Sequence, residues 1–194
     1  RSSIDQIAAE LREASGVDVG VDYTSPAADD ITPMEEREES FAERFGQLCD
    51  LAAPADITVN VEFGPIFGVQ SLPEATRVLA AVDRPNAGIL LDNLHFDRAG
   101  HTNDEIATID DAHIRYAQLC DGPASLGDRS PASLRRDALD DRCNLGEGGL
   151  PWRGFLDALP SDTPISLEIR SAKLRTMFPD KNERAKAVMS ATRL

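Results

Sequence analysis

The fold is set by one stretch of the sequence, in which an apolar run gives way abruptly to polar side chains: Ala87-Gly88-Ile89-Leu90-Leu91-Asp92-Asn93-Leu94-His95-Phe96-Asp97-Arg98. Residues 87–91 are small or aliphatic, and such a run predicts a strand that is buried on both faces. Asp92 begins a polar segment at the carboxyl end of this strand, which is where α/β sheets carry their functional sites. The stretch therefore predicts an α/β protein with a site next to Asp92.

Three further apolar runs end in the same way, with a polar side chain after a predicted strand. Residues 57–61 lead to Glu62, residues 114–117 lead to Gln118 and then Asp121, and residues 164–167 lead to Glu168. The carboxyl ends of parallel strands meet at one edge of a sheet, so these side chains are expected to face one another. Because carboxylate and amide oxygens are ligands of hard divalent cations, the pattern predicts one metal ion held between the strands.

The segments between these strands have the apolar spacing of helices. Helices are predicted at 4–14, 34–53, 71–82, 103–109, 152–159 and 185–192, and a further strand at 17–23. Alternating strands and helices are typical of a parallel sheet with helical crossovers. The sequence holds five such units, whereas a TIM barrel has eight in roughly 250 residues. Residues 121–144 show no regular pattern and are predicted as a long loop with a functional role.

The composition argues against several classes of partner. The 194 residues are 41% hydrophobic, which is enough for a sizeable core, and they carry a formal net charge of -14. This charge argues against nucleic-acid binding, which relies on basic surfaces. No apolar run could span a bilayer and no signal-peptide pattern is present, so we expect no membrane partner. The widely spaced Cys49, Cys120 and Cys143 are typical of a reducing compartment, and we expect a cytoplasmic protein with a small-molecule substrate.

The order of the four predicted ligands and one later stretch resemble a known family. The later stretch is Arg142-Cys143-Asn144-Leu145-Gly146-Glu147-Gly148-Gly149-Leu150-Pro151. It is similar to the Arg-x-x-Pro-Gly-Glu-Gly-x-Leu-Pro sequence of the xylose isomerase-like TIM-barrel superfamily, with Leu145 where a proline is common. These sugar phosphate isomerases and epimerases include hydroxypyruvate isomerases, ketose 3-epimerases, inosose dehydratases and 3-dehydroshikimate dehydratases.

The resemblance implies a (β/α)8 TIM barrel of which residues 1–194 supply about strands four to eight, as the carboxyl-terminal part of a single domain. The first three strand–helix units of the family have no counterpart in this sequence. A barrel fragment would have two open sheet edges, so we expect the amino-terminal units to be missing from the sequence. The alternative is a shortened homologue that is completed as a homodimer or is inactive.

In this family the fifth to eighth strands supply Glu, Asp, His or Gln, and Glu to one divalent ion. The resemblance therefore implies that Glu62, Asp92, Gln118 and Glu168 bind a metal. Three carboxylates and one amide suit Mn²⁺ or Mg²⁺, with Co²⁺ or Zn²⁺ as alternatives. A glutamine at position 118 is similar to the dehydratase and hydroxypyruvate isomerase branches. The alternative for strand-end carboxylates is that they cap a helix or pair with an arginine.

Glu62, Glu168 and His95 are the predicted catalytic residues. The two glutamates would bind the metal, and the one with an oxygen free toward the substrate would carry a proton. His95 completes the family's Asp-x-x-His pattern, which implies an acid or base that faces the metal. A structural hydrogen bond is the alternative for this histidine.

Three further residues are predicted to contact the substrate, and each has a structural alternative. Arg98 and Arg142 could bind a carboxylate or phosphate through paired hydrogen bonds, or form surface ion pairs. Asp121 could accept a hydrogen bond from a substrate hydroxyl, or orient Gln118. The glycines at 146–149 lack the lysine and the preceding strand of a phosphate-binding loop, so we expect a tight turn there.

Together these features predict a divalent-metal-dependent isomerase, epimerase or dehydratase. Its substrate would be a small sugar-like or hydroxy-acid carbonyl compound, which loses a proton next to a metal-bound oxygen. Endonuclease IV shares this barrel but needs a histidine-rich multi-metal site and a basic face, and three histidines with a net charge of -14 argue against a nuclease. A non-catalytic barrel that binds a sugar-like ligand is the other alternative.

Overall fold

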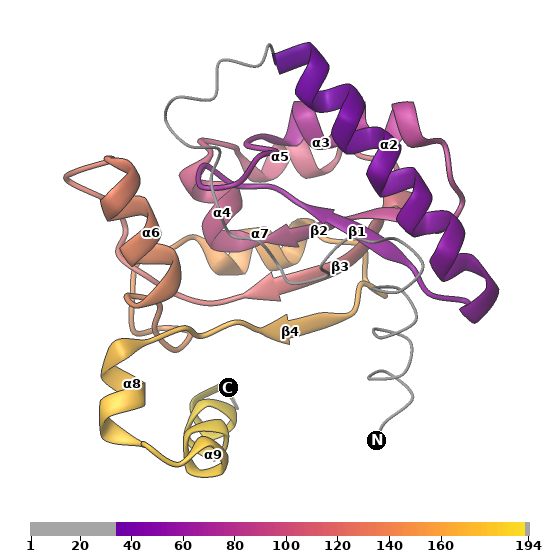
Figure 1. Ribbon diagram of the computed structural model, residues 1–194. Helices are drawn as coiled ribbons and strands as arrows, with labels where there is room; N and C mark the ends of the chain where they lie inside the picture. The colour runs from indigo at the N-terminus through magenta and orange to yellow at the C-terminus, as the bar shows by residue number, and fades with distance from the viewer. Residues whose placement is uncertain (1–33, 193–194) are drawn as a thin grey trace.

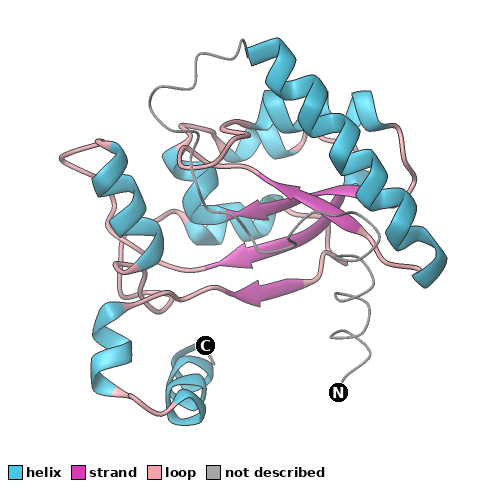
Figure 2. Ribbon diagram, viewed as in Figure 1, coloured by secondary structure: helices cyan, strands magenta, loops and turns pink. Residues whose placement is uncertain are grey.

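Four parallel strands form the centre of the molecule (Figures 1 and 2). The computed structural model describes residues 34–192, so the predicted helix at 4–14 and strand at 17–23 lie outside the described residues. The strands pair in the order β1-β2-β3-β4, and each pair is parallel, which confirms the predicted architecture. They are β1 (Val59–Glu62), β2 (Ala87–Asp92), β3 (Ile114–Leu119) and β4 (Ile165–Leu167).

Helices connect these strands, and α2 and α3 pack against each other beside β1 and β2 (Figure 1). The crossover from one parallel strand to the next is what places helices along the sheet. The helices are α2 (Met34–Ala52), α3 (Leu72–Val82), α4 (Asn93–Arg98), α5 (Asn103–Ile106), α6 (Pro131–Leu139), α7 (Trp152–Ala158), α8 (Ala172–Met177) and α9 (Lys181–Thr192), with short 3-10 turns η1 (Ala53–Ala55) and η2 (Asp111–His113).

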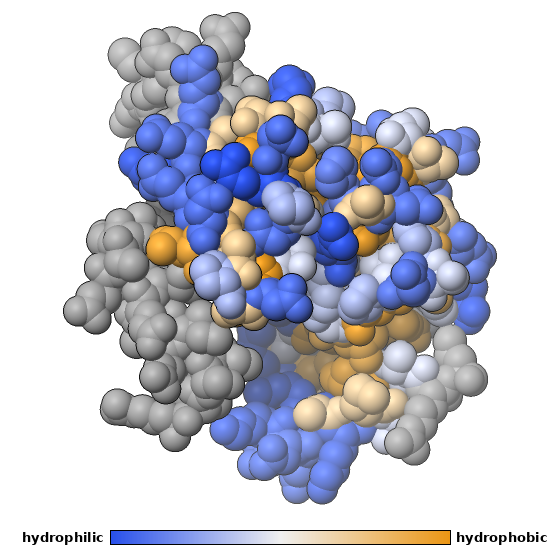
Figure 3. All heavy atoms as spheres, turned by 90° about the vertical axis from the view of Figure 1, so that its right-hand side faces the viewer, coloured by the Kyte–Doolittle hydropathy of each residue, from blue (hydrophilic) through white to orange (hydrophobic). Residues whose placement is uncertain are grey.

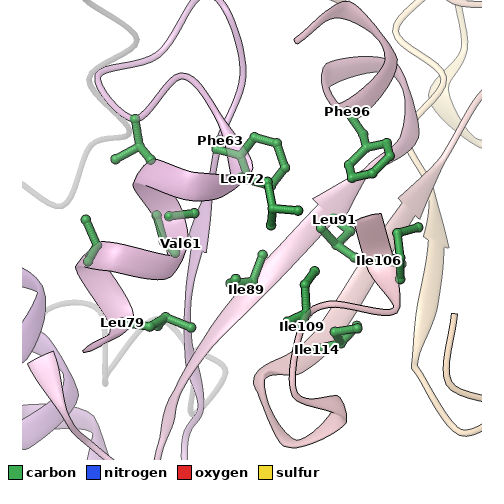
Figure 4. Packing of buried hydrophobic residues seen from close by; sticks show 14 of the residues in the cluster. Val61, Phe63, Leu72, Leu79, Ile89, Leu91, Phe96, Ile106, Ile109 and Ile114 are labelled. Carbon is green, nitrogen blue, oxygen red and sulfur yellow. The ribbon is translucent and has the colours of Figure 1, made fainter. Parts of the chain in front are cut away.

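The main hydrophobic core lies between one face of the sheet and the helices (Figure 4). Ile89 and Leu91 of β2 are fully buried there, together with Val61 of β1 and Leu79 of α3. Burying one side chain of this size contributes roughly 1.5–3 kcal/mol relative to leaving it exposed. Because side chains alternate along a strand, Asp92 points to the opposite face of the sheet.

The strand register places the predicted ligands on this second face. Asp92 pairs with Gln118, which in turn pairs with Ser166, so these three side chains share a face. Glu62 pairs with the residue two positions before Asp92, and Glu168 follows Ser166 by two positions. A period of two therefore brings all four predicted ligands to the same face, at the carboxyl ends of the strands.

Short helices occur where the sequence pattern does not predict them. Helix α4 begins directly after Asp92, because this side chain accepts hydrogen bonds from the backbone N–H groups of Leu94 and His95. Helix α6 interrupts residues 121–144, so the prediction of a continuous loop there is wrong. The oxygen of Ser130 caps α6, and a proline occupies its first turn.

The surface includes an apolar groove of about 800 Å³ between α9, α7 and β4, with Leu156, Leu167 and Val188 among the side chains that line it. Figure 3 shows apolar side chains gathered above the polar side chains at the bottom of the molecule. None of the helices between residues 34 and 192 combines the length and apolar character that a membrane-spanning segment needs.

Candidate metal centre and active-site cleft

Asp92 lies at the centre of the candidate site, at the carboxyl end of β2 and the start of α4 (Figure 1). Its Oδ1 accepts the N–H groups of Leu94 and His95 at 2.9 and 3.0 Å. Its Oδ2 accepts a hydrogen bond of 2.6 Å from Nη1 of Arg142. Asp92 is only 2% exposed. A buried carboxylate needs such partners, so these contacts fix both its charge and its orientation.

Arg142 links α6 to the carboxylates of the site. Its Nε donates to the carbonyl oxygen of Ala138 at 2.9 Å, and its Nη2 lies 3.3 Å from Nε2 of His95. Its Nη1 also lies 3.7 Å from Oε2 of Glu168. Arg142 is 2% exposed, so it acts as a buried counter-charge for the carboxylates.

Glu62 and His95 face each other beside Asp92. The distance between Oε1 of Glu62 and Nε2 of His95 is 3.8 Å. The imidazole ring packs edge-on against Phe67, with 4.7 Å between ring centres. Position 64 must be a glycine for the ring to fit, because a Cβ on Gly64 would lie 2.8 Å from the imidazole. One ligand atom each from Glu62, Asp92 and His95 lie within 4.8 Å of one another.

Glu168 and Gln118 complete this face of the sheet. The backbone N–H of Glu168 donates to the carbonyl oxygen of Leu119 at 3.0 Å, which continues the pairing of β4 with β3. The Oε1 atom of Gln118 is buried and has no hydrogen-bond partner among the described residues. A buried amide oxygen without a partner is costly, and a ligand that is absent from the structure would explain it.

The buried charges shift several pKa values. Burial raises the pKa of Glu62 to about 8, and repulsion from Asp92 and Glu168 adds to this effect. Burial also raises the pKa of Glu168, against the opposing charge of Arg142. Burial alone would raise the pKa of Asp92, but Arg142 and His95 hold it below its ordinary value. Burial lowers the pKa of His95 to about 4, so the imidazole is neutral at pH 7.

These residues fit a divalent cation. A spread of 4.8 Å between the ligand atoms of Glu62, Asp92 and His95 matches donors around one ion at roughly 2.0–2.6 Å. The neutral imidazole can donate a lone pair, and the buried oxygen of Gln118 needs a positive partner. Oxygen donors with one nitrogen are compatible with Mn²⁺, Co²⁺ and Zn²⁺.

A family model described as a xylose isomerase-like TIM barrel matches residues 1–193. The chain belongs to this family. Both the resemblance and the TIM-barrel fold class predicted from the sequence are thereby confirmed.

Among the curated relatives of this chain, the inosose isomerase of Bacillus velezensis is 28% identical over 127 residues. The inosose isomerase of Bacillus subtilis is 26% identical over 127 residues. In both cases the match covers 64% of this chain and 43% of the relative. The matched region is therefore less than half the length of these curated relatives.

Solved structures of similar fold include the IolI protein with a bound zinc atom, at a TM-score of 0.72 and 20% identity. That match covers 97% of this chain and 67% of the other. A probable 3-DHS dehydratase, AsbF from Bacillus anthracis, matches with a TM-score of 0.58 and 21% identity, over 80% of this chain and 56% of that one. These similarities show that the xylose isomerase-like chain shares the fold of both proteins.

Arg98, predicted to bind substrate, is not brought to the metal-ligand cluster. Its Nε donates to Oδ2 of Asp137 at 2.7 Å, and its Nη2 donates to the carbonyl oxygen of Pro123 at 2.6 Å. It also pairs with Asp97, and it is only 3% exposed. Arg98 thus ties α4 to α6 and to the loop before α6.

The Asp121 carboxylate also forms hydrogen bonds within the protein. Its two carboxylate oxygens accept the backbone N–H groups of Gly122, Gly146 and Leu150 at 2.8–3.0 Å. A Cβ on Gly148 would lie 2.3 Å from the carbonyl oxygen of Gly122. Asp121 and the glycines therefore hold the predicted tight turn against the end of β3.

The cleft beside the metal ligands contains residues that the sequence analysis does not select. Glu62, His95, Arg142 and Glu168 line it. Its remaining walls come from other elements, and their residues include Ile66, Phe67, Leu139 and Arg170. The spacing of Glu168 and Arg170 is a signal for the last of these, because residues two apart in an extended segment share a face.

Stability of the metal-free protein is expected to fall as the pH rises from 6.5 to 8. The folded-state pKa of Glu62 is about 8 against an ordinary value of 4.5, so the folded state keeps a proton that the unfolded state has lost. This gives a slope of at most about 1.4 kcal/mol per pH unit. The pKa of His95 is about 4 in the folded protein against an ordinary value of 6.5, so this histidine opposes the decrease near pH 6.5 and no longer does so at pH 8.

Thermal unfolding with a chelator present would measure this effect in the parent and in Glu62→Gln. The parent is expected to lose melting temperature between pH 6.5 and 8, and the variant is expected to lose clearly less. Metal affinity of the parent should rise over the same range, because binding must displace the proton. Equal slopes for parent and variant would contradict the prediction.

Proposed function

We propose that this protein is a divalent-metal-dependent isomerase, epimerase or dehydratase acting on a small sugar-like or hydroxy-acid carbonyl compound. The observation that carries the proposal is the convergence of Glu62, Asp92 and His95 within 4.8 Å at the carboxyl edge of a parallel sheet. Its family, and relatives named as isomerase and dehydratase, support the same group of reactions. The cysteines among the described residues are free, which supports a cytoplasmic location.

Glu62, Asp92, Gln118 and Glu168 would hold the ion, with His95 as a further donor. Mn²⁺ and Mg²⁺ suit the oxygen set, and a contribution from His95 would favour Zn²⁺ or Co²⁺. When bound, a divalent ion supplies a Lewis acid that polarises a substrate carbonyl. Arg142 keeps Asp92 ionised and correctly turned for this role.

Glu62 is the residue we propose to take the proton from the substrate carbon. Its carboxylate lines the cleft, and its ionic contact among the described residues is the 3.8 Å approach to His95. Glu168 also lines the cleft, but its Oε2 faces Arg142. His95 is neutral and close to Glu62, so it can accept or return a proton in the following step.

Exchange of a substrate C–H with deuterium from solvent tests this proposal, because proton abstraction is common to isomerisation, epimerisation and elimination. The purified protein would be loaded with Mn²⁺ or Mg²⁺, and exchange at the carbon next to the carbonyl would be followed by NMR for a panel of hydroxy-carbonyl compounds. We expect about one ion per chain by mass spectrometry, and exchange that chelation abolishes. The apo protein reloaded with metal is the control.

Two results would contradict the proposal in different ways. A protein that takes up no metal after reconstitution does not contain the proposed centre. A protein that binds one ion and a panel compound but exchanges no proton is a non-catalytic ligand-binding barrel.

A further inference from the structure

The side chain of Asn93 takes the place of a strand partner at the carboxyl end of β2. Its Nδ2 donates to the carbonyl oxygen of Cys120 at 2.9 Å, and its Oδ1 accepts the backbone N–H of Cys120 at 2.9 Å. Both residues are buried. A carboxamide carries a donor and an acceptor on one carbon, so it can pair with a backbone segment as a neighbouring strand does.

This pairing begins where the backbone pairing of β2 with β3 ends. The last paired residues of the two strands are Asp92 and Gln118. The chain then turns into α4 at Asn93, whereas β3 continues to Leu119. Without the Asn93 amide, the backbone N–H and C=O of Cys120 would lose these partners in a buried position, which is costly. Asn93 therefore holds the end of β3 against the end of β2.

The chain around Cys120 carries two groups of the candidate site. Gln118 lies two residues before it, and the buried Oε1 of this side chain has no hydrogen-bond partner among the described residues. Asp121 follows it, and the backbone of Asp121 forms hydrogen bonds of 3.1 and 2.9 Å with that of Cys143. Arg142 directly precedes Cys143, and its Nη1 also lies 3.5 Å from Sγ of Cys120. A displacement of this segment would move both the amide and the guanidinium relative to the carboxylates.

We propose that Asn93 is a positioning residue of the metal centre, which sets the spacing between Asp92 and Gln118 so that both can hold one ion. The inference rests on the proposed function, because it assigns a role in the same site. Asn93 acts through Cys120 and is not among the residues that line the cleft. Contacts that orient the ligands of a metal typically change its affinity by roughly 10- to 100-fold.

Asn93→Ala removes both hydrogen bonds to Cys120 and tests this role. Helix α4 should be retained, because Asp92 still caps it and alanine favours helices. We expect Mn²⁺ to bind roughly 10- to 100-fold more weakly than to the parent in calorimetric titrations. The visible absorption of bound Co²⁺ depends on the number and arrangement of its ligands, and we expect this spectrum to differ from that of the parent.

Asn86→Ala is the matched control, because Asn86 also ties backbone segments together. Its Nδ2 donates to the carbonyl oxygens of Cys49 and Ile57 at 2.8 and 3.1 Å. It directly precedes β2, at the opposite end of this strand from Asp92. The variant should lose melting temperature but keep the Mn²⁺ affinity and the Co²⁺ spectrum of the parent. A general loss of stability would therefore not reproduce the result expected for Asn93→Ala.

Hydrogen exchange in the parent protein tests the same coupling without a substitution. If the pairing of Asn93 with Cys120 favours metal binding, a bound metal must in turn favour this pairing. Exchange of the Cys120 amide hydrogen, followed by NMR, should therefore slow at saturating Mg²⁺, which is diamagnetic. Amides of α3, which lies outside the metal site, should change much less.

The outcomes separate this inference from the function on which it rests. If Asn93→Ala keeps the Mn²⁺ affinity and the Co²⁺ spectrum of the parent, Asn93 has only a structural role and the proposed function stands. Equal weakening in Asn86→Ala leads to the same conclusion. If Asn93→Ala does not fold, a Cys120 amide whose exchange is unchanged by Mg²⁺ overturns the inference. If the parent binds none of the three ions, both the metal centre and the role of Asn93 are wrong.

Discussion

Replacing Asp92 by alanine is expected to lower the free energy of unfolding of the metal-free protein by about 3–5 kcal/mol. The change leaves the Arg142 guanidinium buried without its 2.6 Å partner. It also removes the acceptor of two N–H groups at the start of α4, and losing a helix cap costs roughly 1 kcal/mol by itself. Urea unfolding in the presence of a chelator would measure the difference.

An exposed ion pair of the same type supplies the matched control. Asp50 and Arg84 also approach to 2.6 Å, but their side chains are 57% and 42% exposed. Asp50→Ala is expected to change stability little, because solvent screens the pair. The argument from burial would be wrong if Asp92→Ala destabilised the protein no more than Asp50→Ala does.

The Asp92→Asn variant distinguishes the effect of the helix cap on stability from the effect of the negative charge next to Arg142. Its amide oxygen can still accept the N–H groups of Leu94 and His95, but it no longer neutralises Arg142. We therefore expect a loss of stability that is smaller than in Asp92→Ala and clearly larger than in Asp50→Ala.

Glu62→Gln is expected to slow the exchange of substrate protons with solvent by about 10²- to 10⁴-fold. The amide keeps an oxygen that can face a metal ion but cannot accept the proton. The fold should be retained, because the ionic contact of Glu62 among the described residues is the 3.8 Å approach to His95. Exchange followed by NMR at saturating Mn²⁺ would measure the effect, with metal content determined on the same sample.

Glu62→Ala and Glu43→Gln complete this experiment. The alanine variant should lose exchange and also bind metal more weakly, since it has no oxygen at this position. Glu43 lies on the exposed surface of α2, and its replacement should leave both properties unchanged. If metal-loaded Glu62→Gln still exchanges substrate protons at nearly the parent rate, Glu62 is not the residue that takes the proton, and Glu168 or His95 would carry it instead.

Much of the framework follows from local sequence. Apolar runs followed by Glu62, Asp92, Gln118 and Glu168 predict the strands and the edge at which they end, and the structure has β1 to β4 there. The sequence pattern does not predict the short helices α4 and α6. Helix α4 begins at the side chain of Asp92, which caps it, and α6 begins at Ser130 and the proline that follows. A few polar contacts stabilise such short helices, and they are too short to show a clear apolar periodicity in the sequence.

The sequence by itself determined the parallel α/β architecture, the family and the set of oxygen-bearing side chains, because hydrophobic periodicity and motif order are local properties. Only the tertiary structure decided which ion pairs the arginines form. Arg98 and Arg142 are both predicted to bind a substrate anion, but packing places Arg98 against Asp137 of α6 and Arg142 against Asp92 of β2. Partners distant in sequence determine which ion pairs these two guanidinium groups form, and only packing brings those partners together.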